Sequence, residues 1–330
     1  MKRLTVLLAL TLSACAAPMV QAPLTPPPNY PGLHAADLAF HVRDGAALPY
    51  LRWSPQGPPR AVVVALHGMN DSSASFRLAG PWWAEHGVET WAYDQRGFGR
   101  SPGKGVWAGE AAMTDDLRDV VAMVRHARPG IPLIVVGESM GGSVAIAAFA
   151  SDNPPDADRV ILLAPGVWGW SSQGPLNGAA LWIAARAMGD HAIETPQFIA
   201  RRVLASDNMI ELIRNGRDPS SIVDTRFDAM SGLVDLMETA SHRLGAMQRP
   251  TLLMYGAHDH VVSKGPMRQA LERAGPAPNL RTAWYADGRH LLNRDLNAEV
   301  VYADALGFIL DPAAPLPSGA PQVLDALTRR

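Results

Sequence analysis

The sequence has 330 residues, of which 48% are hydrophobic and 18% charged, so it is long enough and apolar enough to bury a substantial globular core. Its 29 basic residues nearly balance 31 acidic ones, and no clustered excess of Lys and Arg predicts a nucleic-acid partner. The one cysteine, Cys15, lies near the start, so the folded body contains no disulfide and offers no thiol chemistry.

The first residues predict an export signal. A basic pair and a short apolar run occupy residues 2–12, and the run is too short to span a bilayer. It ends in Leu-Ser-Ala-Cys, which resembles the bacterial lipobox, and alanine rather than aspartate follows the cysteine. We therefore expect residues 1–14 to be a signal peptide and Cys15 to carry a lipid that anchors the protein in the bacterial cell envelope, at the outer membrane facing the periplasm. The alternative is an ordinary secretory peptide cleaved at Ala14 or Ala17.

Residues 15–35 are rich in proline and show no apolar periodicity, which predicts an extended tether of polyproline character. Short alternating segments at 38–42 and 50–53 predict antiparallel edge strands.

Continuous apolar runs then alternate with helical patterns, which predicts a mostly parallel sheet covered by helices on both faces. The predicted strands lie at 61–66, 88–93, 132–136, 160–164, 251–255 and 281–285, and those at 61–66 and 160–164 are unbroken apolar runs. The helical patterns include one around Phe76, Leu78 and Trp82 and others at 113–127, 266–274 and 298–310. This α/β core is expected to comprise residues 36–165 and 250–310.

Residues 166–249 show no strand pattern and predict a helical cap inserted into the core. Helical patterns occur at 179–188, 196–205, 209–214 and 228–243. Its large apolar residues either pack the cap onto the core or line an acyl-binding slot; they are Trp168, Trp170, Trp182, Ile183, Met188, Phe198, Ile199 and Met209. The Pro- and Ala-rich residues 311–330 predict a flexible tail, in which 323–327 could form one helical turn.

Polar residues follow three predicted strands at the carboxyl edge of the sheet, where α/β proteins bind ligands. They are His67, Asp94 and Ser139. Ser139 lies in a Gly-x-Ser-x-Gly turn between a strand and a helix, a pattern that holds the serine in strained geometry with its hydroxyl exposed. The N–H groups of the following helix favour negative charge at the same place. The pattern predicts a nucleophile beside an anion site.

A serine hydroxyl needs a base, usually a histidine that is held by a carboxylate. His290 follows one predicted strand and Asp259 follows the strand before it, whereas Asp287 lies nearer to His290 in sequence. The backbone N–H groups of Met69 and Met140 are the candidate oxyanion donors, each worth on the order of 3 kcal/mol of barrier.

Together these motifs resemble α/β-hydrolases of the monoglyceride lipase, lysophospholipase and serine aminopeptidase-like group. The matching segments, which cover residues 36–310, are His67-Gly68-Met69, Asp94 to Ser101, Gly137 to Gly142, Gly256 to Asp259 and Gly288 to His290. The resemblance implies a mostly parallel eight-stranded sheet with a helical cap after the sixth strand. It also implies Ser139, Asp259 and His290 as the catalytic triad, Asp259 rather than Asp287 as the acid, and His67 as a structural histidine.

The expected activity is hydrolysis, through an acyl-enzyme, of esters with an apolar acyl part, such as a monoacylglycerol or a lysophospholipid, with no cofactor. A peptidase or amidase on the same triad and a non-catalytic envelope binding protein are the alternatives. His258 and His260 flank Asp259 without a third ligand at metal spacing, so we expect solvated histidines and no metal site. Glu138, often His in such turns, is expected to brace the turn or to contact the cap.

Overall fold

The computed structural model describes residues 17–194 and 203–328. The predicted signal peptide, Cys15 and most of the predicted helix at 196–205, with Phe198 and Ile199, lie outside these residues. Within the described ranges, no helix combines the length and the apolar character that crossing a membrane requires.

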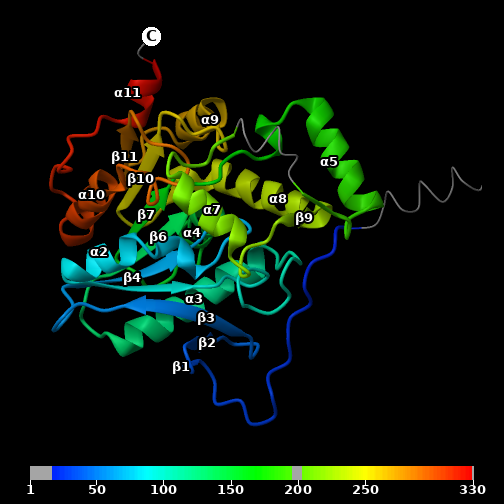
Figure 1. The fold of residues 1–330 in the computed structure, drawn as a ribbon, viewed down its shortest axis with the longest axis horizontal. Helices are drawn as coiled ribbons and strands as arrows, with labels where there is room; N and C mark the ends of the chain where they lie inside the picture. Colours follow the sequence, from blue (N-terminus) through cyan, green and yellow to red (C-terminus); the bar gives the residue numbers. More distant parts are fainter. Residues whose placement is uncertain (1–16, 195–202, 329–330) are drawn as a thin grey trace, which may run out of the picture.

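A nine-stranded sheet forms the centre of the molecule, in the order β1-β2-β3-β5-β4-β6-β7-β10-β11 (Figure 1). Its strands are β1 (His34–Ala36), β2 (Ala39–His41), β3 (Ala47–Trp53), β4 (Ala61–Leu66), β5 (Val88–Tyr93), β6 (Leu133–Glu138), β7 (Arg159–Leu163), β10 (Thr251–Gly256) and β11 (Leu280–Tyr285). The strands from β5 to β11 in this order are parallel, and β1 to β3 form an antiparallel edge. The prediction of a mostly parallel sheet is confirmed. The sheet has one strand more than the predicted eight because the three-residue segment β1, which lies mostly in the predicted tether, pairs with β2.

Strand β4 shows how the sequence builds the core, because every residue of it is buried. Val62, Val64 and Leu66 point into one apolar cluster, and the alternating Ala61, Val63 and Ala65 point into the other. A strand that faces two apolar layers is apolar at every position, which is why it reads as a continuous run.

Helices cover both faces of the sheet (Figure 1). Those of the core are α2 (Ala79–Glu85), α3 (Glu110–Ala127), α4 (Met140–Phe149), α9 (Lys264–Ala274), α10 (Ala298–Leu310) and α11 (Val323–Thr328), with a short 3₁₀ turn at Ser73–Phe76. Two further 3₁₀ turns, Trp170–Ser172 and Leu244–Ala246, lie in the cap.

The cap contains α5 (Pro175–Ala187), α7 (Met209–Arg217) and α8 (Phe227–Arg243). It also contains the antiparallel pair β8 (Ala192–Glu194) and β9 (Asp224–Arg226), which the sequence pattern did not predict because three-residue, largely exposed strands carry no apolar alternation. The cap is therefore helical with one small two-stranded sheet.

Residues 311–328 differ from the expected flexible tail. Leu316, Val323 and Leu327 are buried, and Ser318 donates its backbone N–H to the Asp304 carboxylate at 2.8 Å. Single buried apolar side chains, widely spaced along the sequence, hold this segment on the core. They form no periodic pattern, so the sequence did not predict their burial.

Candidate active site

Ser139 lies at the sharp turn between β6 and α4, with φ 52° and ψ −116°. A non-glycine residue in this region is strained, and glycines relieve the crowding around it. A Cβ on Gly137 would lie 2.5 Å from the carbonyl oxygen of Gly141, and a Cβ on Gly141 would lie 2.5 Å from that of Leu66. The turn therefore needs glycine at both positions, and it presents the serine hydroxyl at the carboxyl edge of the sheet.

The structure brings Ser139, His290 and Asp259 together from three separate loops. Nε2 of His290 is 2.9 Å from Oγ of Ser139, and Nδ1 is 2.8 Å from Oδ2 of Asp259. The other carboxylate oxygen of Asp259 accepts the N–H groups of Val261 and Val262 at 2.8 Å each. Asp259 is thus held by two backbone donors, and it orients the imidazole toward the serine.

Burial lowers the pKa of His290, but the charge of Asp259 and its hydrogen bond to the ring outweigh this effect and raise the pKa above its ordinary value. The Glu138 carboxylate adds to the rise, and the Arg294 guanidinium opposes it. The imidazole is therefore a stronger base than an isolated histidine.

The loop after β4 lies directly beside Ser139, since a Cβ on Gly68 would be only 3.3 Å from Cβ of Ser139. The backbone N–H groups of Met69 and Met140 donate to no acceptor among the described residues. These two predicted donors are available to an oxyanion.

His67 holds the loop after β4 in place through hydrogen bonds to Gly68 and Gln95. It is fully buried, its Nε2 accepts the N–H of Gln95 at 3.0 Å, and its Nδ1–H donates to the carbonyl of Gly68 at 2.7 Å. The Gln95 side chain donates in turn to the carbonyl of His67 at 2.7 Å. His67 thus has a structural position, and Gln95 is a supporting residue that the sequence reading missed.

Glu138 pairs with a residue that the sequence reading also missed. Its carboxylate accepts from Arg294 at 2.6 Å, and the same guanidinium contacts Asp71 at 2.8 Å. All three side chains are buried. Arg294 therefore joins the turn of Ser139, the loop of His290 and the loop of Met69. Glu138 was expected to brace the turn or to contact the cap, and its pair with Arg294 fits the first of these roles.

Cap residues contact the same catalytic loops. Ile222 donates its N–H to the carbonyl of Asn70 at 2.9 Å, and the Asn70 amide donates to the Thr225 hydroxyl at 2.6 Å. On the other side, Leu291 donates its N–H to the carbonyl of Ala205 at 2.8 Å. The position of the cap is thus tied to the loops that carry Met69 and His290.

The other candidates lie elsewhere. Asp287, His258 and His260 are exposed, and Asp94 is buried as an acceptor for Ser73 and Arg100. The described ranges contain no cluster of three or more His, Cys, Asp or Glu side chains that could hold a metal ion. The carboxylate that contacts His290 is Asp259, not Asp287.

Residues 57–297 match the family model described as serine aminopeptidase, S33. The chain is 26% identical to a monoacylglycerol lipase of Mycolicibacterium smegmatis over 234 residues, covering 69% of this chain and 81% of the relative. It is 25% identical to the monoglyceride lipase of Rattus norvegicus over 288 residues, covering 84% and 90%.

Among solved structures, a soluble variant of the monoglyceride lipase of Saccharomyces cerevisiae has a similar fold, with a TM-score of 0.68, 19% identity and coverage of 91% of this chain and 96% of that one. A carboxyl esterase from Bacillus coagulans has a TM-score of 0.65 at 17% identity, with coverage of 84% and 98%. Since the family match covers more than half of the chain, the protein belongs to the serine aminopeptidase S33 family of α/β-hydrolases and is an ester-hydrolysing enzyme.

Proposed function

We propose that this protein is a serine hydrolase that cleaves lipid esters with one apolar acyl chain, of the monoacylglycerol or lysophospholipid kind, through an acyl-enzyme. The carrying observation is the hydrogen-bonded series from Ser139 through His290 to Asp259, with the N–H groups of Met69 and Met140 beside it. No cofactor is needed for this chemistry.

In the proposed reaction, Nε2 of His290 takes the proton from Oγ of Ser139 as the oxygen attacks the ester carbonyl. The tetrahedral oxyanion accepts from the N–H groups of Met69 and Met140. Collapse expels the alcohol, which receives the proton from His290, and leaves the acyl group on Ser139. A water molecule, deprotonated by His290, then releases the fatty acid and regenerates the hydroxyl. Asp259 stays ionised and stabilises the imidazolium in both steps.

The relatives that are monoacylglycerol lipases support the choice of substrate class. The family description favours a second candidate, an aminopeptidase. An aminopeptidase requires a carboxylate that binds the α-amino group of its substrate. Glu138, the acid next to Ser139, is buried and paired with Arg294, so it is not available for that role. We therefore rank ester hydrolysis first.

The Ser139→Ala variant tests the function. It should lower kcat for monoacylglycerols and p-nitrophenyl esters by about 10⁶-fold and abolish labelling by a fluorophosphonate probe, because no nucleophile is left to form the acyl-enzyme. The exposed Ser54→Ala serves as the control and should leave both unchanged. Labelling that persists in Ser139→Ala would refute the assignment, and faster turnover of aminoacyl amides than of esters by the wild type would favour the peptidase.

For location, we propose that residues 1–14 are removed and that a lipid on Cys15 anchors the protein at the outer membrane, facing the periplasm. The lipobox-like Leu-Ser-Ala-Cys sequence and Ala16 support this proposal. A membrane location also suits an enzyme whose substrate is a lipid.

A further inference from the structure

The segment before β1 is extended, as its proline content indicates, but it is attached to the core. Gln21 donates its backbone N–H to the carbonyl of Trp107 at 2.9 Å and its side-chain amide to that of Val106 at 2.7 Å. Leu24 donates its N–H to Asp44 at 3.1 Å, and the Tyr30 hydroxyl donates to the carbonyl of Val42 at 2.6 Å. Residues 19–30, the strap, are therefore bound at three separate places.

The surface under the strap is shaped by glycines with positive φ. A Cβ on Gly103 would overlap the side chain of Gln21, and one on Gly109 would lie 2.9 Å from Cγ1 of Val20. On the hairpin between β2 and β3, a Cβ on Gly45 would lie 3.0 Å from Cα of Pro26. A free tether would not need such close approaches along its length.

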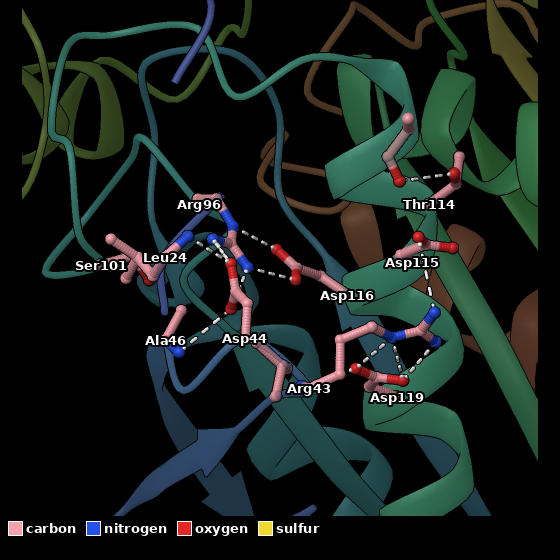
Figure 2. Close-up of polar contacts among 12 residues, drawn as sticks. Leu24, Arg43, Asp44, Ala46, Arg96, Ser101, Thr114, Asp115, Asp116 and Asp119 are labelled. Atoms are coloured by element: carbon pink, nitrogen blue, oxygen red, sulfur yellow. Dashed lines mark hydrogen bonds and ion pairs between the residues drawn. The ribbon is translucent and has the colours of Figure 1, made fainter. Parts of the chain in front are cut away.

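An ion cluster holds Asp44, the residue that accepts the N–H of Leu24, in place (Figure 2). Arg96 contacts Asp44 at 2.5 and 2.9 Å and Asp116 on α3 at 2.7 and 2.9 Å. Burial raises the pKa of Asp44, but hydrogen bonds from Arg96 and from the N–H groups of Ala46 and Leu24 outweigh it and lower the pKa. The carboxylate is thus stabilised in the charged form that accepts the N–H of the strap.

The loop that binds Gln21 also contacts the cap. A Cβ on Gly232 of α8 would overlap the Trp107 indole, and Lys104 donates to the carbonyl of Pro219 at 2.6 Å. Figure 1 shows the strap in blue as it rises from β1 toward the cap. Only six residues lead from Cys15 to Gln21, a span of about 22 Å at most. A tether that was free as far as His34 would reach about 65 Å.

The cap exposes two apolar helix faces. Ala185 is the only buried residue in α5, where Leu176, Trp182 and Ile183 are 85%, 43% and 57% exposed. On α7, Ile210 and Ile213 are 71% and 52% exposed.

Helix α7 does not bury its apolar face, as a surface helix of a globular protein usually does. Its one buried side chain is the acid Glu211, which pairs with Arg77 of the core, whereas the apolar side chains of Met209, Ile210 and Ile213 are exposed. Arg214 and Arg217 on the same helix are exposed. Apolar side chains flanked by arginines suit the boundary between lipid headgroups and acyl chains.

We propose that the strap holds the lipid anchor beside the cap, so that α5 and α7 rest on the bilayer into which the anchor is inserted. The partner of this surface is the membrane that carries the Cys15 lipid, and the inference rests on the lipid anchor and the lipid-ester activity proposed above. The short segment between Cys15 and Gln21 keeps the cap close to the bilayer that contains the substrate. The effective concentration of the cap at the bilayer surface would fall if this linker were longer.

A fluorescence experiment tests the orientation. Since Cys15 is the only cysteine and is consumed by lipidation, a new cysteine can be labelled alone with an environment-sensitive dye. In the full lipidated chain on vesicles of phosphatidylethanolamine and phosphatidylglycerol, a dye at Ile183→Cys should become protected from an aqueous quencher. A dye at Gln56→Cys should stay accessible, because Gln56 is exposed and precedes β4, at the sheet edge opposite the cap. Equal accessibility at the two sites would overturn the proposal.

A second experiment tests the strap itself. The double variant Gln21→Ala, Gly103→Leu removes side-chain bonds of the strap and fills its groove. The matched control is Gln56→Ala, Gly105→Leu, because Gly105 has a similar positive φ with open space around it. Releasing the strap at Gln21 should lower turnover of vesicle-embedded monoacylglycerol about twofold, the fall expected when the next point of attachment is Leu24 and the linker from Cys15 lengthens from six residues to nine. Turnover of a water-soluble short ester should not change.

The outcomes separate this inference from the ones on which it rests. If the released and control variants turn over vesicle substrate equally, the strap has no orienting role, even though the enzyme is active. Loss of soluble-ester turnover in Ser139→Ala reports on the catalytic proposal alone, and failure of the wild type to float with vesicles reports on the anchor alone.

Discussion

At the level of single residues, the side chains of the proposed triad lie beside a second, buried set of charges. Glu138 directly precedes Ser139, and Arg294 lies four residues after His290. Their two charges act on the His290 pKa in opposite directions, the carboxylate raising it and the guanidinium lowering it. The pair therefore holds three loops together and also balances the basicity of His290.

Because the two charges act in opposite directions, removing each of them should shift the pH dependence of hydrolysis in opposite directions. Hydrolysis needs the neutral imidazole, so the acidic limb of kcat/KM follows the pKa of His290 and should lie above 6.5, its ordinary value. Glu138→Gln removes the charge that raises the pKa and should move the limb to lower pH. Arg294→Gln removes the charge that lowers it and should move the limb to higher pH. The measurement is kcat/KM for a soluble ester from pH 5 to pH 9.

Arg294→Gln also leaves two carboxylates buried without their partner, which should cost about 3–5 kcal/mol of stability. Arg294→Lys retains the charge and should keep the limb of the wild type. Glu89→Gln provides the matched control, because Glu89 is also a buried acid paired with an arginine, Arg128, but it lies near the amino end of β5. Shifts of the same sign in Glu138→Gln and Arg294→Gln would show that the residues act only through folding.

Local pattern was enough to predict the nucleophile turn, because Gly-x-Ser-x-Gly is a constraint among neighbours. The choice of Asp259 over Asp287 needed the family resemblance, since sequence distance does not report distance in space. The Glu138–Arg294 pair, separated by 156 positions, left no local signal at all. An arginine among the few residues after His290 was the only available hint.

At the scale of elements, the nucleophile turn depends on close packing between α4 and β4. A Cβ on Gly141 would lie 2.5 Å from the carbonyl oxygen of Leu66, and backbone cannot move aside as a side chain can. Gly141→Ala should therefore lower the free energy of unfolding by about 1–3 kcal/mol and misplace the Met140 N–H.

Thermal unfolding and soluble-ester kinetics together check this prediction. The Tm should fall by about 2–4 °C per kcal/mol, and kcat should fall more than KM rises, because oxyanion binding strengthens in the transition state. Gly216→Ala in α7 is the control, since nothing lies within 4 Å of its Cβ position, and it should leave the Tm equal or slightly higher. An unchanged kcat in Gly141→Ala would contradict the proposed role of the turn.

The elements that sequence could predict are those buried on two faces. The run at 61–66 coincides with β4, because burial on both faces favours an apolar residue at every position. Strands β1, β8 and β9 could not be found in this way, since each has three residues and depends on its partner rather than on its own composition. The strap likewise owes its position to acceptors on the loop before α3 and on the hairpin before β3.

At the scale of the whole molecule, attachment to the membrane is proposed to depend on Cys15. The apolar run at 2–12 is too short to span a bilayer, and none of the helices in the described ranges could cross one. The exposed faces of α5 and α7 would add only an interfacial contact, which is reversible on its own. The lipid should therefore supply most of the retention.

Cys15→Ala should release the enzyme from the membrane fraction of an expressing Gram-negative cell and leave it in the soluble periplasmic fraction. The variant should keep its turnover of a soluble short ester, because the hydrogen-bonded series of Ser139, His290 and Asp259 does not include Cys15, and it should lose metabolic labelling by palmitate.

Washing the wild-type membranes with carbonate separates lipid anchoring, which survives the wash, from interfacial contact through the cap, which does not. Unchanged fractionation of Cys15→Ala would overturn the anchor. A wild-type protein found in the soluble fraction would instead support an ordinary secretory peptide, and the strap would then lie on a protein that is free in the periplasm.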